Sequence, residues 1–184
     1  MRAALWSFIV VSALTGCFAS RPPDNVDFGA AQSLRDLEGT YWNLGEFDPK
    51  QTPAAYLSKI IWPGLEESRH RSIQTIVVRA MGDTGLSVQA LSSSGVAKEQ
   101  AFVRGKDFEF SGGRLRLGSY WENSLKEPEA GGLFFAHTTK ELGVDRKGQG
   151  KYKSRQTVAG AAYLVVPVAM SQTNEVRFVR IGDK

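Results

Sequence analysis

The sequence has very few of the residues that build metal sites and nucleophilic sites. Its 184 residues include one cysteine and two histidines, His70 and His137. It contains no His-Glu-x-x-His motif and no closely spaced pair of cysteines, so we predict no metal site and no cofactor. The Gly-x-Ser-x-Gly motif of many serine hydrolases is also missing, and we assign no catalytic residue.

Signals for phosphate or nucleic-acid binding are weak. Gly143 and Gly148 have the spacing of a P-loop, but Gln149 occupies the position of its lysine. The formal net charge of +4 is too small to indicate a nucleic-acid partner. The carboxylates are scattered along the chain, which leaves a small hydrolase with two converging acids as one alternative.

The N-terminal apolar run is too short to span a membrane. After the basic Met1-Arg2, residues 3–14 are apolar except for Ser7 and Ser12, and the chain becomes polar again from Ser20. A transmembrane helix needs about 20 apolar residues, whereas this layout is typical of a secretory signal.

Leu14-Thr15-Gly16-Cys17 closes this run and resembles the lipobox of bacterial lipoprotein precursors. The resemblance implies that residues 1–16 are a signal peptide and that Cys17 carries a diacylglyceryl thioether and an acylated amino terminus. Two or three acyl chains make a stable anchor, whereas one holds only marginally. Phe18 differs from the Asp that retains enteric lipoproteins in the inner membrane. The resemblance therefore implies an outer-membrane location, facing the periplasm.

Residues 17–33 have the composition of a flexible tether. Pro22-Pro23 favours extended backbone, and Gly29-Ala30-Ala31 offers little apolar surface to bury. In an alternative arrangement Val26 and Phe28 dock on the domain. Residues 34–184 form the predicted single β-rich domain.

The remainder of the chain predicts a mainly β fold. Runs rich in β-branched and aromatic residues alternate with Gly, Ser, Asn and Asp, and Leu86, Val88 and Ala90 share one face of a strand. One short helix is expected over 54–62, with Thr52 as cap and Pro53 in its first turn, and 66–71 reads as a charged loop. The expected strands cover 40–44, 73–80, 85–91, 98–104, 107–111, 114–117, 132–140, 151–158, 161–169 and 175–181. We expect an antiparallel meander of about 8–10 strands, closed as a barrel or a sandwich.

Two further resemblances are more general. Gly39-Thr40-Tyr41-Trp42 resembles the entrance motif of lipocalins, with the tryptophan one place late. That resemblance implies a closed barrel that carries an apolar ligand. The chain as a whole resembles small uncharacterised lipoproteins of Gram-negative bacteria, which implies no particular activity.

Two groups of residues are candidates for binding. Lys151, Lys153 and Arg155 alternate along one strand, and no acidic residue occurs between Asp145 and Glu175. Such a face attracts anions such as lipid head groups, lipopolysaccharide or peptidoglycan carboxylates, or it serves only to discourage edge-to-edge aggregation. Tyr120 and Trp121, expected in a loop, are a candidate aromatic patch for a ligand or partner, unless they pack into the core.

We therefore expect an outer-membrane lipoprotein that acts as a non-enzymatic binding or envelope-assembly component. Its expected partners are the membrane, through the lipid on Cys17, and an anionic envelope component or another envelope protein. The alternatives are the lipocalin-like carrier and the small hydrolase.

Overall fold

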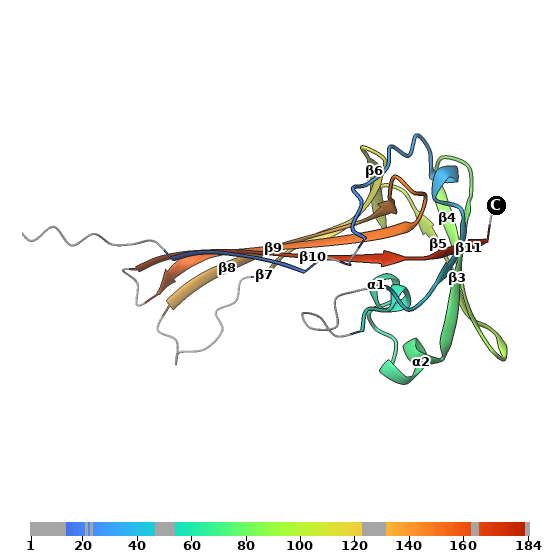
Figure 1. Cartoon of the computed structure of the whole chain (residues 1–184), viewed down its shortest axis with the longest axis horizontal. Helices are drawn as coiled ribbons and strands as arrows, with labels where there is room; N and C mark the ends of the chain where they lie inside the picture. The colour runs from blue at the N-terminus through green and yellow to red at the C-terminus, as the bar shows by residue number, and fades with distance from the viewer. Residues whose placement is uncertain are drawn as a thin grey trace, which may run out of the picture.

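The computed structural model describes residues 14–20, 22, 24–46, 54–122, 132–162 and 166–182. Figure 1 shows two β-sheets that meet at one end of a set of long strands. The elements are β1 (Leu14–Ser20), the 3-10 helix η1 (Leu34–Leu37), β2 (Gly39–Trp42), α1 (Leu57–Ile61), α2 (Glu67–Ser72), β3 (Ile73–Ala80), β4 (Gly85–Ser92), β5 (Gly95–Val103), β6 (Phe108–Ser111), β7 (Arg114–Glu122), β8 (Gly132–Val144), β9 (Gly150–Ala162), β10 (Val166–Phe178) and β11 (Arg180–Gly182).

The strands form a long sheet and a short sheet. The long sheet has the order β1-β10-β9-β8-β7-β6, and the short sheet has the order β11-β2-β3-β4-β5. All neighbouring strands are antiparallel except β1, which runs parallel to β10. Short hairpin connections explain the antiparallel order, since two successive strands need only a tight turn between them.

The hydrophobic core lies between the two sheets. Ile76, Val88 and Ala90 from the short sheet face Val176 and Phe178 from the long sheet, and all five are buried. The burial of Leu86, Val88 and Ala90 confirms the expected alternation of β4.

The prediction of a mainly β, antiparallel fold is confirmed, with β1 as the parallel exception. Neither sheet closes on itself through the described strands, so the fold corresponds to the sandwich rather than the barrel. The closed barrel implied by the lipocalin resemblance is therefore not formed by these strands. The expected meander is divided in two, β2 to β5 and β6 to β10.

The helical content differs from the prediction. The helix expected over 54–62 covers only Leu57–Ile61, and its expected cap, Thr52, and Pro53 lie outside the described residues. A second helix, α2, occupies the segment expected to be a charged loop. Its His70 is buried against α1 although its neighbours are exposed, so one buried residue fixes an otherwise polar helix. No helix of the described residues is long and apolar enough to cross a membrane.

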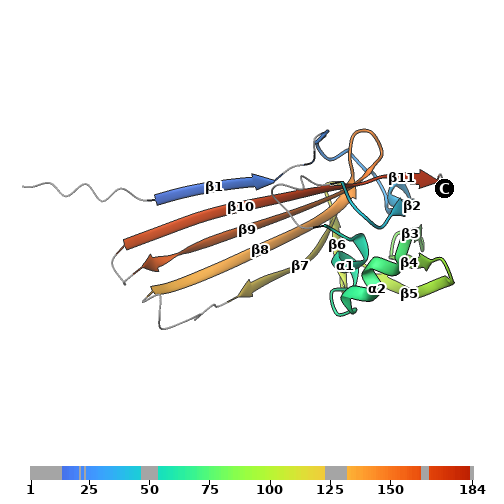
Figure 2. The ribbon, with the colours of Figure 1, turned by 60° about the horizontal axis from the view of Figure 1, so that its bottom comes forward.

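The long strands β8, β9 and β10 extend beyond the core as an arm, with β1 along β10 and the end of β7 along β8 (Figures 1 and 2). We define the arm as β1 together with residues 132–140 of β8, 154–162 of β9 and 166–174 of β10. The strands β8, β9 and β10 each have 13 residues, whereas the sequence predicted shorter runs at 132–140, 151–158, 161–169 and 175–181. The chain reverses between Ala162 and Val166 within an apolar run, which offered no glycine or asparagine to mark a turn.

The segment from Asp24 to Ser33 contacts the long sheet. Phe28 forms a β-bridge with Asp145, and the Gly29 amide donates to the Val144 carbonyl oxygen at 2.8 Å. Gly113 has φ +75° and allows close approach, because a Cβ there would lie 2.8 Å from the Ala31 amide nitrogen. This part of the expected tether is thus in the docked arrangement given above as the alternative, while the domain boundaries themselves stay a prediction.

Candidate functional site

The chemical character of the long sheet changes in steps from the core to the tip of the arm. Residues directly opposite one another on β8, β9 and β10 form rows, and the side chains of a row point to the same face. On the face away from the core, which we call the outer face, the rows are Gly143–Lys151–Arg177, Glu141–Lys153–Glu175, Thr139–Arg155–Thr173, His137–Thr157–Ser171 and Phe135–Ala159–Ala169. Charge therefore gives way to neutral polar residues and then to apolar ones.

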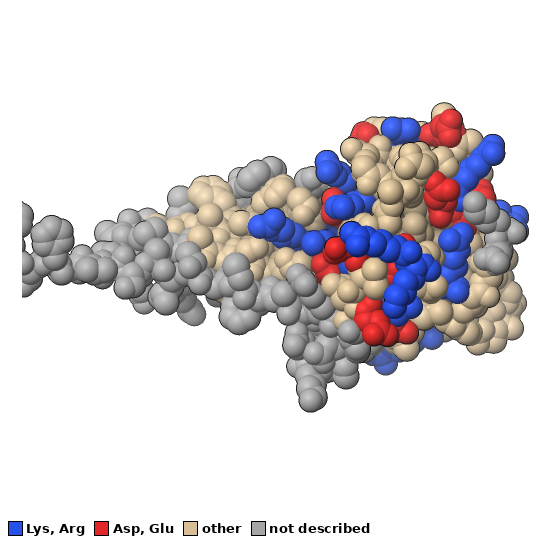
Figure 3. Space-filling view, turned by 45° about the horizontal axis from the view of Figure 1, so that its top comes forward, with Lys and Arg blue, Asp and Glu red and all other residues tan. Residues whose placement is uncertain are grey.

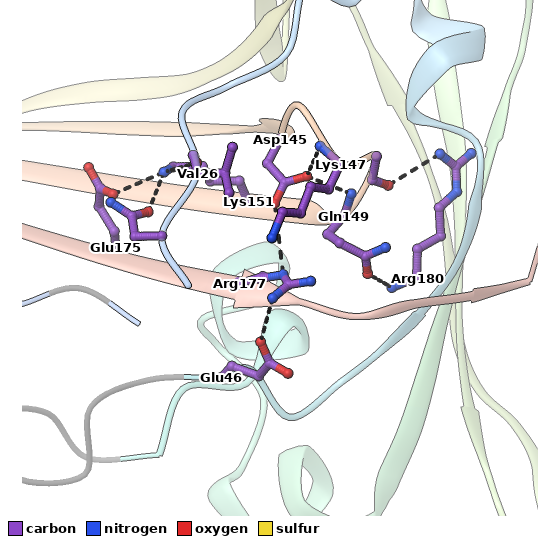
Figure 4. A network of polar contacts seen from close by, with 11 residues as sticks. Val26, Glu46, Asp145, Lys147, Gln149, Lys151, Glu175, Arg177 and Arg180 are labelled. Atoms are coloured by element: carbon purple, nitrogen blue, oxygen red, sulfur yellow. Dashed lines mark hydrogen bonds and ion pairs between the residues drawn. The ribbon is translucent and has the colours of Figure 1, made fainter. Parts of the chain in front are cut away.

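A buried ion pair lies on the outer face at the base of the arm. Lys151 and Glu175 are each 4% exposed, and Lys151 Nζ lies 3.0 Å from Glu175 Oε2. Lys151 also donates to Asn25 Oδ1 at 2.6 Å and to the Val26 carbonyl oxygen at 2.7 Å. All three contacts involve the ammonium group, so its charge is satisfied within the molecule (Figure 4).

The titration of Glu175 follows from these contacts. Burial by itself raises the pKa of this carboxyl group, but hydrogen bonds and charge attraction from Lys151 and Lys153 outweigh burial, so the pKa lies below its usual value. Lys153 Nζ lies 3.2 Å from Glu175 Oε1. Glu175 is therefore a permanent anion at neutral pH, and it holds both lysines.

The turn between β8 and β9 leads into the strand that carries Lys151. Asp145 Oδ1 accepts hydrogen bonds from the amides of Lys147 and Gln149, at 2.8 and 2.9 Å, and Gly148 takes a φ of +76°. These bonds form an Asx-type turn that contains Gly148, whereas Gly143, the other glycine of the P-loop spacing, lies in β8 against the Phe28 ring. Arg177 then joins Asp145 Oδ2 to Glu46, at 3.8 and 3.4 Å, beside the turn (Figure 4).

Next to the ion pair, the outer face carries a basic surface. We call Arg114, Arg116, Lys153 and Arg155 the basic face; with Thr139 and Glu141 they line a shallow depression. Glu141 pairs with Arg114 at 3.3 Å and with Arg116 at 3.5 Å, and Lys153 shares Glu175 with Lys151, so the four cations of the basic face outnumber the carboxylates beside them. Charged residues cover the domain and the base of the arm in Figure 3, whereas the described arm surface farther out is uncharged.

The backbone of Cys17 lies beside this boundary. In the register of β1 with β10, Cys17 stands opposite Ser171. The Arg155 Nε atom lies 3.4 Å from Ser171 Oγ, so a guanidinium group reaches the row of the arm at which Cys17 is placed. Ser171 of β10 is therefore the shared neighbour of the Cys17 backbone on one side and the Arg155 side chain on the other.

The three basic residues predicted for anion binding do not remain equivalent. Lys151, Lys153 and Arg155 do share one face of β9, as expected. Lys151, however, is buried and paired, which leaves Lys153 and Arg155 to face solvent. The sequence showed no acid between Asp145 and Glu175, but Glu175 itself pairs across the strands with Lys153, and Asn25 reaches Lys151 from 126 residues away. The sequence analysis missed these contacts because the partners lie far apart along the chain.

The predicted aromatic patch is placed differently from the expectation. Tyr120 and Trp121 do not lie in a loop, because β7 continues to Glu122 and pairs them with Thr138 and His137 of β8. Their side chains lie outside the described part of the structure. The patch therefore stays a prediction, on a strand instead of a loop.

A serine and a histidine meet in the core, a contact that the sequence analysis did not find. Ser58 Oγ lies 2.9 Å from His70 Nδ1, and Asn43 accepts from the Ser58 amide and donates to the His70 carbonyl oxygen. Ser58 is 0% and His70 1% exposed. The cluster joins α1 and α2 to Asn43, the residue that follows β2. Because a substrate cannot reach the buried Ser58, we assign the cluster a structural role.

Three clefts of the described residues differ in size and character. The apolar pocket between the sheets has a volume of about 220 Å³, below the roughly 300–1,000 Å³ of typical ligand sites, whereas two more polar clefts of about 770 and 470 Å³ fall within that range. The acidic lining residue of the apolar pocket is Asp107, and the two other clefts contain Asp83 and Glu141 respectively. None of the three has the paired acids of a glycosidase. Within the described ranges no group of three or more His, Cys, Asp or Glu residues could hold a metal ion.

Comparison with known proteins gives no relative. No family model, no curated protein and no solved structure matches the chain. The class that the fold defines is a two-sheet β domain with an extended arm.

Proposed function

We propose that the protein is a lipoprotein anchored in the outer membrane through Cys17, facing the periplasm, and that it acts as a non-enzymatic binding or envelope-assembly component. The anchor rests on the lipobox resemblance of Leu14-Thr15-Gly16-Cys17, and the observation that supports a role at the membrane is the register of Cys17 opposite Ser171, whose Oγ lies 3.4 Å from Arg155 Nε. Removal of residues 1–16 would leave Cys17–Ser20 of β1 beside β10, so acyl chains on Cys17 and the basic face would lie at the same level of the molecule.

This arrangement suits a membrane with anionic head groups. The acyl chains supply the anchor, and the guanidinium groups of Arg114, Arg116 and Arg155 can bind phosphate oxygens with two hydrogen bonds each. Charge attraction extends over about 8 Å at physiological salt, so the basic face acts only when it is already close to the surface. The anchor provides this closeness by confining the domain near its partners.

The test compares the full chain with its Cys17→Ser variant after expression in a Gram-negative host. We expect the unaltered chain to incorporate labelled palmitate, to lose residues 1–16 and to fractionate with the outer membrane, and the variant to do none of these. A control with Ser20→Cys added to the variant restores a thiol outside the lipobox and should remain unacylated. Acylation of this control, or an unacylated Cys17, would reject the proposal.

The same fractionation tests the basic face. In the Cys17→Ser background, residual binding to anionic membranes should fall with added salt and with Arg116→Ser, Lys153→Ser and Arg155→Ser combined. The matched control changes Lys98, Arg104 and Lys106 to serine, which lie on or next to β5 in the other sheet. Equal losses in both triple variants would mean that only net charge matters.

A further inference from the structure

The outer part of the arm contains no charged residue on β8, β9 or β10; the charged residue described beside it is Glu122, at the end of β7 and opposite Ala136. Residues 130–139 and 156–174 include no Asp, Glu, Lys or Arg. These ranges supply β8 from Gly132, the second half of β9 and β10 as far as Asn174. Nineteen consecutive uncharged residues in a hairpin contrast with the rest of the same strands, where Lys151, Lys153, Arg155, Glu175 and Arg177 alternate closely.

Both faces of this part are apolar. The outer face has the row Phe135–Ala159–Ala169, and the opposite face has the row Ala136–Val158–Met170. Phe135 on the outer face and Met170 on the opposite face are 43% and 45% exposed, whereas Ala136 is 8% exposed and Val158 is half-buried. A sheet with a single core shows alternation of apolar and polar residues, whereas apolar rows on two faces with exposed members on each indicate a surface that another phase or molecule covers.

The position of the boundary identifies what covers it. The row of Ser171, opposite Cys17, separates the cations from the apolar rows. In an acylated protein the glycerol on Cys17 lies where head groups meet acyl chains. Arg155 then lies on the head-group side, and Phe135 and Ala159 lie two residues to the other side, about 7 Å farther along the strand.

We infer that the uncharged tip of the arm inserts into the membrane surface, at the boundary between phospholipid head groups and acyl chains. The inference rests on the proposed function, because the lipid on Cys17 sets how deeply the arm meets the membrane. The sheet is open at its edges, and unpaired backbone groups are not tolerated in the hydrocarbon core. The tip therefore enters the boundary and does not cross the bilayer, as interfacial elements that bury about 5–10 Å do.

The experiment places a fluorophore sensitive to polarity on the tip. The Cys17→Ser chain has no other cysteine, so A159C and, as the control on the domain, K106C can each be labelled uniquely. We expect vesicles of phosphatidylethanolamine with one quarter phosphatidylglycerol to shift the A159C emission to the blue and lipids brominated near the head group to quench it. The K106C label should stay in water.

Variants separate the tip from the N-terminal apolar run, which is still present in this chain. Phe135→Ser with Met170→Ser should weaken vesicle partitioning about tenfold, given the apolar area removed. Met81→Ser with Val96→Ser removes two comparably exposed apolar residues from the domain and should change little. Equal effects of the two pairs would overturn the inference.

Two other results would also overturn it. If the A159C label is already shielded without vesicles and the protein doubles in mass, a second copy covers the tip. If the label stays in water on bound vesicles, the tip does not insert. The chain tested carries no acyl group, so either result leaves the proposed lipidation of Cys17 unaffected. Conversely, if the earlier test finds no acylation, insertion of the tip can still be measured.

Discussion

The two ends of β9 differ in burial and in the chemical character of the side chains around them. At its start Gly150 and Lys151 are buried, and every contact of the Lys151 ammonium group is with the protein itself. Near its end Ala159 is exposed, and its cross-strand neighbours are Phe135 and Ala169. The strand therefore begins in a buried network whose polar groups bond to one another, and it ends in an apolar surface that is exposed.

This difference separates stability from binding. The base of the arm carries the costly groups, a buried ammonium and a buried carboxylate, and it satisfies them with the N-terminal segment and β10. The tip carries groups that cost little to fold but much to keep in water. We expect changes at the base to alter the free energy of unfolding and changes at the tip to alter association.

The largest contrast is expected between two phenylalanines. Phe178 is 1% exposed between the sheets, so Phe178→Ala should lower the free energy of unfolding by about 4 kcal/mol. Phe135→Ala on the tip should lower it by less than about 1 kcal/mol, since half-exposed residues lose little burial. Urea unfolding of the Cys17→Ser protein, followed by tryptophan fluorescence, measures both. Similar losses would show that the tip belongs to the folding core.

A smaller contrast is expected between two carboxylates. Glu175→Gln leaves Lys151 buried without its counter-charge and should cost about 3 kcal/mol. Glu141→Gln removes a partner from the partly exposed Arg114 and Arg116 and should cost at most about 1 kcal/mol. The same unfolding curves give both values. A large loss at Glu141, or none at Glu175, would place the important ion pairs on the basic face.

Local patterns in the sequence were enough for the fold class. Alternation over Leu86, Val88 and Ala90 located a strand, and short turns such as Gly82-Asp83-Thr84-Gly85 located hairpins. The same reasoning divided β9 and β10 into shorter pieces, because a strand that leaves the core loses its alternation and no turn residue marks the reversal between Ala162 and Val166. The three strands are long because they continue past the core into the arm, and local sequence patterns do not show this continuation.

The candidate site was predictable only in part. The alternation of Lys151, Lys153 and Arg155 correctly placed them on one face, but Lys151 is withdrawn from solvent by Asn25, Val26 and Glu175. These partners lie far away in sequence, and no spacing rule connects them. The uncharged ranges that define the tip are visible in the sequence, yet only the register of β8, β9 and β10 shows that they lie side by side.

The smallest effect expected is a pH dependence at the base of the arm. The pKa of Glu175 is lowered in the folded protein because Lys151 and Lys153 outweigh burial. Between that lowered value and the ordinary value of 4.5, the unfolded chain binds a proton that the folded chain does not. The stability that Glu175 contributes is therefore complete above about pH 4.5 and is lost as the pH falls through the folded pKa, by at most about 1.4 kcal/mol per pH unit.

Unfolding curves of the protein and of Glu175→Gln should converge as the pH falls below this range, whereas those of the protein and of Phe135→Ala should keep a constant separation. A separation between the protein and Glu175→Gln that does not change with pH would mean that the carboxylate is not held by the two lysines.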